Sequence, residues 1–212
     1  MTRVVLGLLS ALAVAALFLF ADPVVTAACA DSSLAACEGM GGRFSLVTLL
    51  RAAVGLPIVA AWRWRASGWR ADDRGVRWPA AAAIVAVTVV SAVLYERLSG
   101  GSPEFVVEVC RTARPGWLLV VAMLAAAPLF EEALFRGLMF DWMTRRGLPV
   151  AIVGTSLAWV SVHGQYDVAG TALLLWMGIL LAGARAVSGG LALPVAMHAA
   201  WNLRALMVAW PA

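Results

Sequence analysis

Residues Ala125 to Gly137 read AAAPLFEEALFRG and place two adjacent carboxylates, Glu131 and Glu132, inside an apolar stretch that also holds Arg136. A charged side chain at the centre of a membrane helix costs about 2.5 to 3.5 kcal/mol on insertion scales. A chain that keeps such groups there either pairs them or uses them, so an intramembrane ionisable residue is a functional-site hypothesis by default. The stretch therefore predicts both a membrane helix and a site.

The rest of the chain has the same apolar character. Of its 212 residues, 63% are hydrophobic and 13% are charged, and the mean hydropathy is +0.89. Soluble domains average about 45–50% apolar and about 25% charged residues. Because a helix needs about 20 apolar residues to cross a membrane, the chain has room for roughly seven spans with short loops. We expect an all-α, polytopic transmembrane helix bundle without a separate soluble domain.

Seven apolar runs separated by polar residues define the expected spans. They are Val4–Ala21, Phe44–Trp62, Trp78–Leu98, Pro115–Arg145, Leu148–His163, Val168–Ala184 and Leu191–Trp210.

The first run, Val4–Ala21, has two interpretations. The small residues Ala28 to Ala30 resemble the cleavage site of a signal peptide. The run is long for the apolar part of a signal, so we favour a retained helix, which Asp22 and Pro23 are expected to end.

Arginine placement predicts the orientation of the bundle. The net charge is +4 and all 16 basic residues are Arg, five of them in the loop Arg63–Arg77. Short basic loops stay in the cytoplasm, so this loop marks the inner side. Alternation then places the N-terminus and the turns at Arg145 and Arg185 inside. Because the arginines lie between apolar runs, we read them as topology signals and not as a nucleic-acid surface.

Two of the three cysteines, Cys29 and Cys37, flank a short polar loop that this orientation places outside. A disulfide is possible there, because oxidising compartments permit one. Two unpaired thiols remain the alternative.

Side-chain direction separates the roles of the two glutamates. Glu132 and Arg136 are four residues apart and share one face of an α-helix, where they can form an ion pair. Glu131 is rotated by about 100° from Glu132. We expect Arg136 to neutralise Glu132 while Glu131 faces a cavity, and Pro128 to remove one backbone hydrogen bond just before the pair.

Three more polar residues fall within later spans: His163, His198 and Asn202. With Glu131, they lie about 12 to 22 Å from the inner ends of their helices and can share one layer. A carboxylate can act as general base on a water, one imidazole can orient it, and an imidazole with an amide can stabilise an oxyanion. The set therefore suits hydrolysis. The alternatives are an interfacial His163 and a His198–Asn202 pair that joins helices.

The sequence contains three short motifs that follow one another along the chain, each on a separate expected helix. They are Glu131-Glu132-x-x-x-Arg136, Trp159-x-x-x-His163 and His198-x-x-x-Asn202. They resemble the motifs of the CPBP family of intramembrane proteases, which includes the CAAX prenyl endopeptidases and the bacterial "abortive infection" proteins. The resemblance covers roughly residues 115–210. The family's second motif usually begins with Phe, and here Trp159 stands in its place.

The resemblance implies a glutamic-type intramembrane endopeptidase whose catalytic core of about four spans occupies residues 115–212, after about three spans in residues 1–114. Glu131 would be the general base and His163 would help to hold the water. His198 and Asn202 would form the oxyanion site. The candidate catalytic residues are Glu131, Glu132, His163, His198 and Asn202, with Arg136 as a structural ion-pair partner.

No cofactor is expected. The sequence has no H-E-x-x-H, the spacing that presents two His and a Glu base to zinc. Zinc bound by two His and a Glu from three helices is the alternative.

The expected partners are the lipid bilayer and a membrane-associated peptide or protein substrate, with no nucleic acid. We expect a multi-pass protein of the bacterial inner membrane. The sequence does not choose between a prenylated C-terminus, a peptide precursor and a sorting-signal protein as substrate. The competing functions are a proton-coupled transporter, since Glu and His also form proton relays, and a non-catalytic scaffold or immunity factor.

Overall fold

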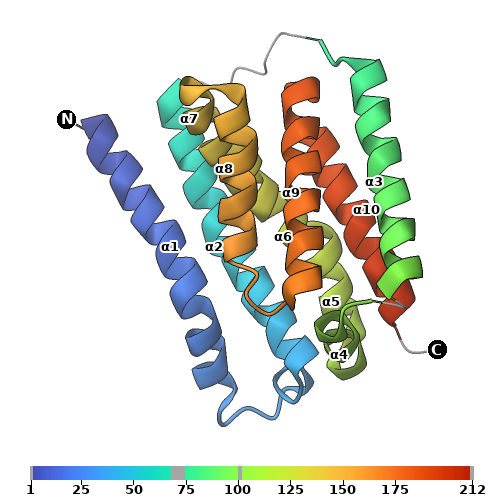
Figure 1. Cartoon of the computed structure of the whole chain (residues 1–212). Coiled ribbons are helices and arrows are strands. Elements are labelled where there is room, and N and C mark those ends of the chain that lie inside the picture. The colour runs from blue at the N-terminus through green and yellow to red at the C-terminus, as the bar shows by residue number, and fades with distance from the viewer. Residues whose placement is uncertain (1, 68–74, 100–101, 211–212) are drawn as a thin grey trace. The chain divides into compact units, whose positions relative to one another are not determined.

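All regular elements in the computed structural model, which describes residues 2–67, 75–99 and 102–210, are helices (Figure 1). The longer ones are α1 (Thr2–Cys29), α2 (Met40–Ser67), α3 (Trp78–Ser99), α8 (Leu148–Ser161), α9 (Val168–Ser188) and α10 (Ala192–Ala209). A run of short helical segments joins α4 (Glu104–Thr112) to α8, beginning with α5 (Gly116–Val121). The expectation of an all-α fold is confirmed.

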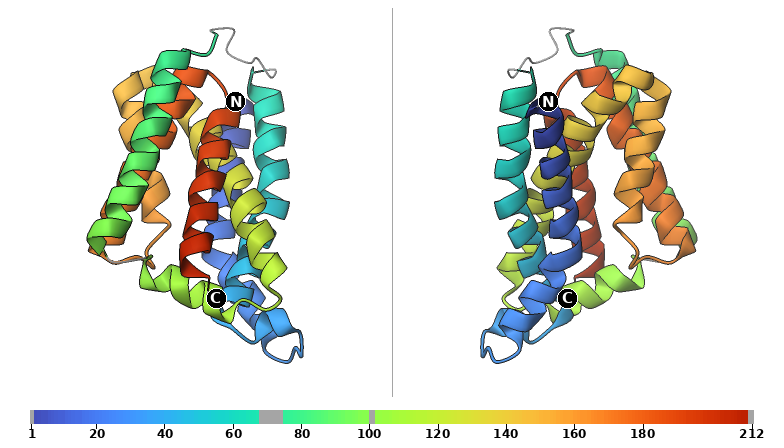
Figure 2. Two further views of the ribbon diagram at one scale, coloured as in Figure 1. Left: turned by 90° about the vertical axis from the view of Figure 1, so that its right-hand side faces the viewer. Right: turned by 90° about the vertical axis from the view of Figure 1, so that its left-hand side faces the viewer.

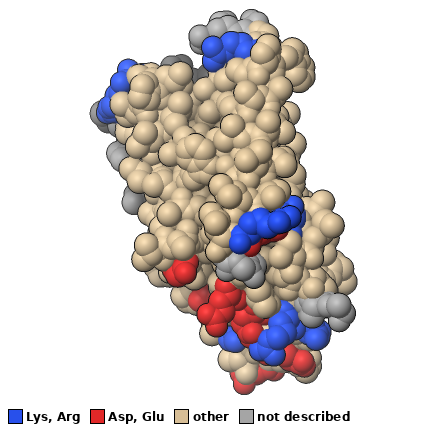
Figure 3. Space-filling model, turned by 45° about the vertical axis from the view of Figure 1, so that its right-hand side comes forward, with Lys and Arg blue, Asp and Glu red and all other residues tan. Residues whose placement is uncertain are grey.

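Within the described residues, four helical stretches are long and apolar enough to cross a membrane. They are Met40–Ala61, Trp78–Leu98, Gly116–Arg146 and Val168–Ser188, and two shorter apolar helices cover Ala16–Cys29 and Leu148–Ser161. Uncharged residues cover most of the face drawn in Figure 3. This surface suits contact with lipid, because lipid tails solvate apolar side chains. Seven spans and an inner N-terminus remain predictions.

Several expected boundaries are wrong. Helix α1 does not end at Asp22 and Pro23 but continues to Cys29 with the proline inside it. In apolar surroundings, backbone N–H and C=O groups find their hydrogen-bond partners within a helix. The hydrogen bonds that a continuous helix keeps outweigh the one that proline removes. Helix α2 extends to Ser67, so it includes the start of the expected Arg63–Arg77 loop. Residues 68–74 of that loop lie outside the described residues.

Helix α4 is an element that the sequence analysis missed. Its residues Val106, Val109 and Cys110 recur at helical spacing and are buried, whereas Val107 between them is exposed. The one-sided apolar pattern over a short segment is typical of a surface helix. The nine residues are too few to cross a membrane.

Contacts divide the chain into two compact units. The first contains residues 1–70, 107–130 and 210–212, and the second contains residues 71–106 and 131–209. Every candidate catalytic residue belongs to the second unit.

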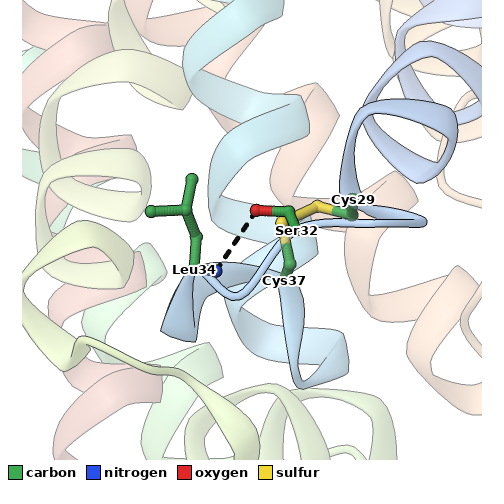
Figure 4. Close-up of a disulfide and its surroundings, with 4 residues drawn as sticks. All are labelled: Cys29, Ser32, Leu34 and Cys37. Atoms are coloured by element: carbon green, nitrogen blue, oxygen red, sulfur yellow. Dashed lines mark hydrogen bonds between the residues drawn. A yellow bond between two sulfur atoms is a disulfide. The ribbon is translucent and has the colours of Figure 1, made fainter.

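In the first unit, α1 and α2 lie side by side (Figures 1 and 2). The connection between them contains a disulfide between Cys29 and Cys37 (Figure 4). In the same connection the backbone N–H of Leu34 donates to Ser32 Oγ. The disulfide interpretation of the two cysteines is therefore confirmed.

In the second unit, α9 is the central helix. It packs against α8, α3 and α10. Trp176 of α9 donates its indole N–H to Ser91 Oγ of α3 at 2.9 Å. The outer face of α3 is apolar and exposed at Val85, Val87, Val89, Val90, Val93, Leu94 and Leu98. The helices of this unit thus present lipid-compatible faces outwards and their polar residues inwards.

Candidate active site

The two glutamates lie at a change in helical winding. Glu131 ends the short helix α6 (Ala127–Glu131), and Glu132 begins a π-helical segment, η3 (Glu132–Met139). A second π-helical segment, η2 (Ala122–Ala126), precedes α6. Pro128 lies between the two segments and has no N–H to donate, which favours a local change of hydrogen-bond pattern. Such π-helical turns occur frequently at functional sites.

The carbonyl of Arg136, within this π-helical segment, gains a partner from another helix. Arg185 of α9 donates Nε–H to the Arg136 carbonyl at 3.0 Å and Nη2–H to Asp141 Oδ1 at 2.8 Å. Its guanidinium also lies over the Phe140 ring. Arg185 therefore fastens the irregular helix to α9 directly after the candidate site.

Glu132 and Arg136 form the expected ion pair. Nη1 of Arg136 lies 3.2 Å from Glu132 Oε1, and both side chains are fully buried, at 0% exposure. Nη2 of Arg136 donates to the Gly178 carbonyl of α9 at 3.1 Å. A buried carboxylate needs a paired partner, so the pair keeps Glu132 in the interior and joins its helix to α9.

Glu132 also contacts His198 of α10, an interaction that the sequence analysis did not predict. Nδ1 of His198 lies 2.9 Å from Glu132 Oε1. Because that oxygen already accepts a hydrogen bond from Arg136, we assign the proton to His198 Nδ1, which donates to it. Glu132 thereby fixes the orientation of the His198 ring and leaves Nε2 for another partner.

Glu131 takes a different set of neighbours. Its Oε2 accepts the indole N–H of Trp159 at 2.6 Å and lies 3.9 Å from His163 Nε2. The side chains of Glu131 and His163 are 15% and 17% exposed, so they are more accessible than the Glu132 pair. Of the two carboxylates, Glu131 is therefore the more exposed.

The tautomer of His163 follows from its other contact. Its Nδ1 lies 2.8 Å from the Trp159 carbonyl, which can only accept, so Nδ1 carries the proton. In the neutral ring, Nε2 is then an acceptor, like the carboxylate of Glu131. Two acceptors 3.9 Å apart do not bond directly, but one water can donate a hydrogen to each.

The remaining candidate, Asn202, lies four residues after His198 on α10 and is partly buried. Two residues further on, Arg204 forms an ion pair with Glu96 of α3. The structure thus brings together two carboxylate–imidazole pairs, Glu131 with His163 and Glu132 with His198.

Trp159 and Tyr166 are site residues whose contacts were not foreseen. The Trp159 ring lies 4.8 Å from the His163 ring and 5.6 Å from the His198 ring. Burial, and next the charge of Glu131, raise the pKa of Tyr166 well above its ordinary value. Two features of the sequence could have indicated these residues. They are the tryptophan in the second motif and the polar turn before α9, where Asp167 caps the helix by accepting from the Gly170 N–H.

The arrangement of possible ligand side chains indicates whether the site can bind a metal. Among the described residues, no group of three or more His, Cys, Asp or Glu side chains is arranged to hold a metal ion. Catalytic zinc sites use three protein ligands, and here the donors form two separate pairs, one of them bonded to Arg136. This donor set does not fit zinc, and a metal-free mechanism stays a prediction.

Comparisons with known proteins found a relative and a matching family model. A protein of Escherichia coli described as "Uncharacterized 24.3 kDa protein" is 39% identical over 85 residues, which are 38% of this chain and 39% of that protein. No solved structure shows a significant match to this chain. Residues 113–204, which include every candidate catalytic residue, match the family model described as Type II CAAX prenyl endopeptidase Rce1-like. Residues 113–204 are therefore similar to the Rce1-like endopeptidases, which is consistent with the CPBP (CAAX protease) family.

Proposed function

We propose that this protein is an intramembrane endopeptidase that hydrolyses a peptide bond of a membrane-associated protein without a metal. The observation that carries the proposal is the 3.9 Å separation between Glu131 Oε2 and His163 Nε2, two acceptors that a single water can bridge. The match of residues 113–204 to an endopeptidase family supports the same reaction class.

In the first step, the bridging water donates one hydrogen to Glu131 and one to His163. Its remaining lone pair faces the carbonyl carbon of the substrate. As the oxygen–carbon bond forms, the proton passes to the Glu131 carboxylate, which acts as general base. A tetrahedral intermediate results, with negative charge on the former carbonyl oxygen.

Two residues of α10, His198 and Asn202, stabilise that oxyanion. Nδ1 of His198 is bonded to Glu132, so Nε2 donates to the oxyanion only when the ring carries both protons. The amide of Asn202, one turn further along α10, supplies the second donor.

In the last step, the carbon–nitrogen bond breaks and Glu131 returns its proton to the leaving amine. The products are a new carboxyl group and an amine. Glu132 contributes no proton in this scheme but holds His198 and Arg136 in place.

The proposed substrate is the C-terminal segment of a membrane-associated protein, as the description of the matching family suggests. A farnesylated peptide ending in Cys-aliphatic-aliphatic-X is the first probe. A peptide precursor and a sorting-signal protein are the next. The proposed setting is the inner membrane of a bacterium.

The test compares the purified full chain with Glu131→Gln, Glu131→Ala and His198→Ala in detergent, using the farnesylated peptide and mass spectrometry of the products. General-base catalysis contributes about 10²–10⁴-fold, so both Glu131 variants should lose at least about 100-fold in rate. Glu108→Gln, which changes an exposed carboxylate in an ion pair with Arg111, is the matched control. Cleavage at the wild-type rate by Glu131→Gln would exclude Glu131 as the base, whereas a wild-type chain that cleaves none of the three kinds of probe would favour a transporter or scaffold.

A further inference from the structure

Trp159 lies at the centre of the polar cluster. It is 2% exposed, and its indole contacts groups from two other helical segments, Glu131 and Arg136 on one and His198 on the other. It also contacts His163 of its own chain segment.

The indole uses its two kinds of surface for two opposite charges. Its N–H donates to the Glu131 carboxylate at 2.6 Å, and its π face lies 5.0 Å from the Arg136 guanidinium. The face of an aromatic ring is negative and attracts cations, whereas the N–H edge is positive and attracts anions. One neutral side chain therefore stabilises both the base and the neighbouring cation.

The hydrogen bond to Glu131 comes from the indole and not from the neighbouring guanidinium. Arg136 donates from Nη1 to Glu132 Oε1 and from Nη2 to the Gly178 carbonyl. A neutral indole N–H fixes the direction of the carboxylate without adding a positive charge.

We propose that Trp159 is a positioning residue for the general base: its Nε1–H holds Glu131 Oε2 so that the carboxylate faces His163 Nε2 and the bridging water. This proposal rests on the proposed function. The second motif of the resembling family usually has Phe at this position, which keeps the ring but has no N–H donor. In this chain the tryptophan adds a hydrogen bond to the base.

The first test is spectroscopic and needs no substrate. The full chain is labelled with ¹⁵N-indole tryptophan in detergent, and the Trp159 resonance is assigned by its loss in Trp159→Phe. Its indole proton should lie downfield of the others, as expected for a short bond to a carboxylate, and should move upfield in Glu131→Gln. Trp176, which donates to Ser91, is the matched control, and its resonance should not move in Glu131→Gln.

The second test is kinetic, with the farnesylated peptide as probe. Trp159→Phe should lower kcat roughly 10- to 100-fold, the value of one hydrogen bond to a charged group, with KM within about twofold. Trp176→Phe should leave both constants unchanged. Replacing Trp159 by 3-benzothienylalanine, which keeps the ring shape and lacks only the N–H, should reproduce the loss if Trp159→Phe does not fold.

The outcomes separate the two proposals. The positioning role would be overturned if the Trp159 resonance did not move in Glu131→Gln, or if the benzothienylalanine variant had the wild-type kcat. Either result would leave the peptidase assignment in place. Unchanged cleavage by Glu131→Gln would overturn Glu131 as the general base, and the spectrum would still decide whether the indole binds this carboxylate.

Discussion

Nδ1 of His198 lies 2.9 Å from Oε1 of Glu132, although the two residues are 66 positions apart in the sequence. The same oxygen accepts from Arg136. The two adjacent glutamates therefore have different partners. Glu132 belongs to a buried ionic network, whereas Glu131 contacts Trp159 and His163.

The first prediction concerns the stability of this network. Glu132→Gln leaves the buried Arg136 without its counter-charge and should lower the free energy of unfolding by about 3 to 5 kcal/mol. Thermal or denaturant unfolding of the purified chain in detergent measures the change. The matched control is Glu108→Gln, an exposed ion-pair partner, which should produce no measurable shift. Equal stability of the two variants would show that the buried pair does not hold the helix.

The second prediction concerns the three cysteines. Burial raises the pKa of the Cys110 thiol, so this residue should resist iodoacetamide in the folded protein. Mass spectrometry should find no alkylated cysteine in the folded, unreduced chain, one after denaturation and three after denaturation with reduction. Cys110→Ser should show none after denaturation alone. Three alkylated cysteines without reductant would contradict the Cys29–Cys37 bond.

The third prediction concerns alkaline pH. Burial keeps the pKa of Tyr166 raised in the folded protein, whereas in the unfolded chain it titrates near 10. The unfolded state then loses its proton first, so the contribution of Tyr166 to stability is complete below about pH 10 and falls as the pH rises above it. In Tyr95→Phe, which leaves a single tyrosine, tyrosinate absorbance should not develop at about pH 11 before unfolding. Reversible ionisation near pH 10 in the folded protein would contradict the burial.

The fourth prediction concerns close packing in the first unit. A Cβ added at Gly55 would run into the ring of Phe130, which is itself buried. Gly55→Ala should destabilise the chain by about 1 to 3 kcal/mol, as overpacking does. Gly75→Ala is the control, because a Cβ there meets no atom within 4 Å. Thermal unfolding of both variants checks the prediction, and a Gly55 variant as stable as the Gly75 variant would contradict the contact.

The sequence was sufficient for local features. Spans such as Trp78–Leu98 are visible as apolar runs, because a helix in lipid must be apolar over its whole length. The Glu132–Arg136 pair followed from a spacing of four residues, which the irregular winding of the helix did not disrupt.

Contacts between helices could not be predicted from the sequence. Spacing does not show which carboxylate faces which imidazole, and the Glu132–His198 bond depends on how α10 is rotated against the π-helical segment. Composition also did not reveal that segment, because its winding depends on partners such as Arg185. Trp159 was recognised only as the residue that stands in place of Phe in the second motif, a position that does not predict a hydrogen-bond donor.

The order of residues in the chain has a consequence for biosynthesis. The segment with Glu131 and Glu132 leaves the ribosome before Trp159 and His198, which later bond to those carboxylates. A newly inserted Gly116–Arg146 helix therefore meets the bilayer with only Arg136 as a local counter-ion. Nascent chains truncated before α8 should consequently integrate poorly, and completion of the last helices should secure them in the membrane.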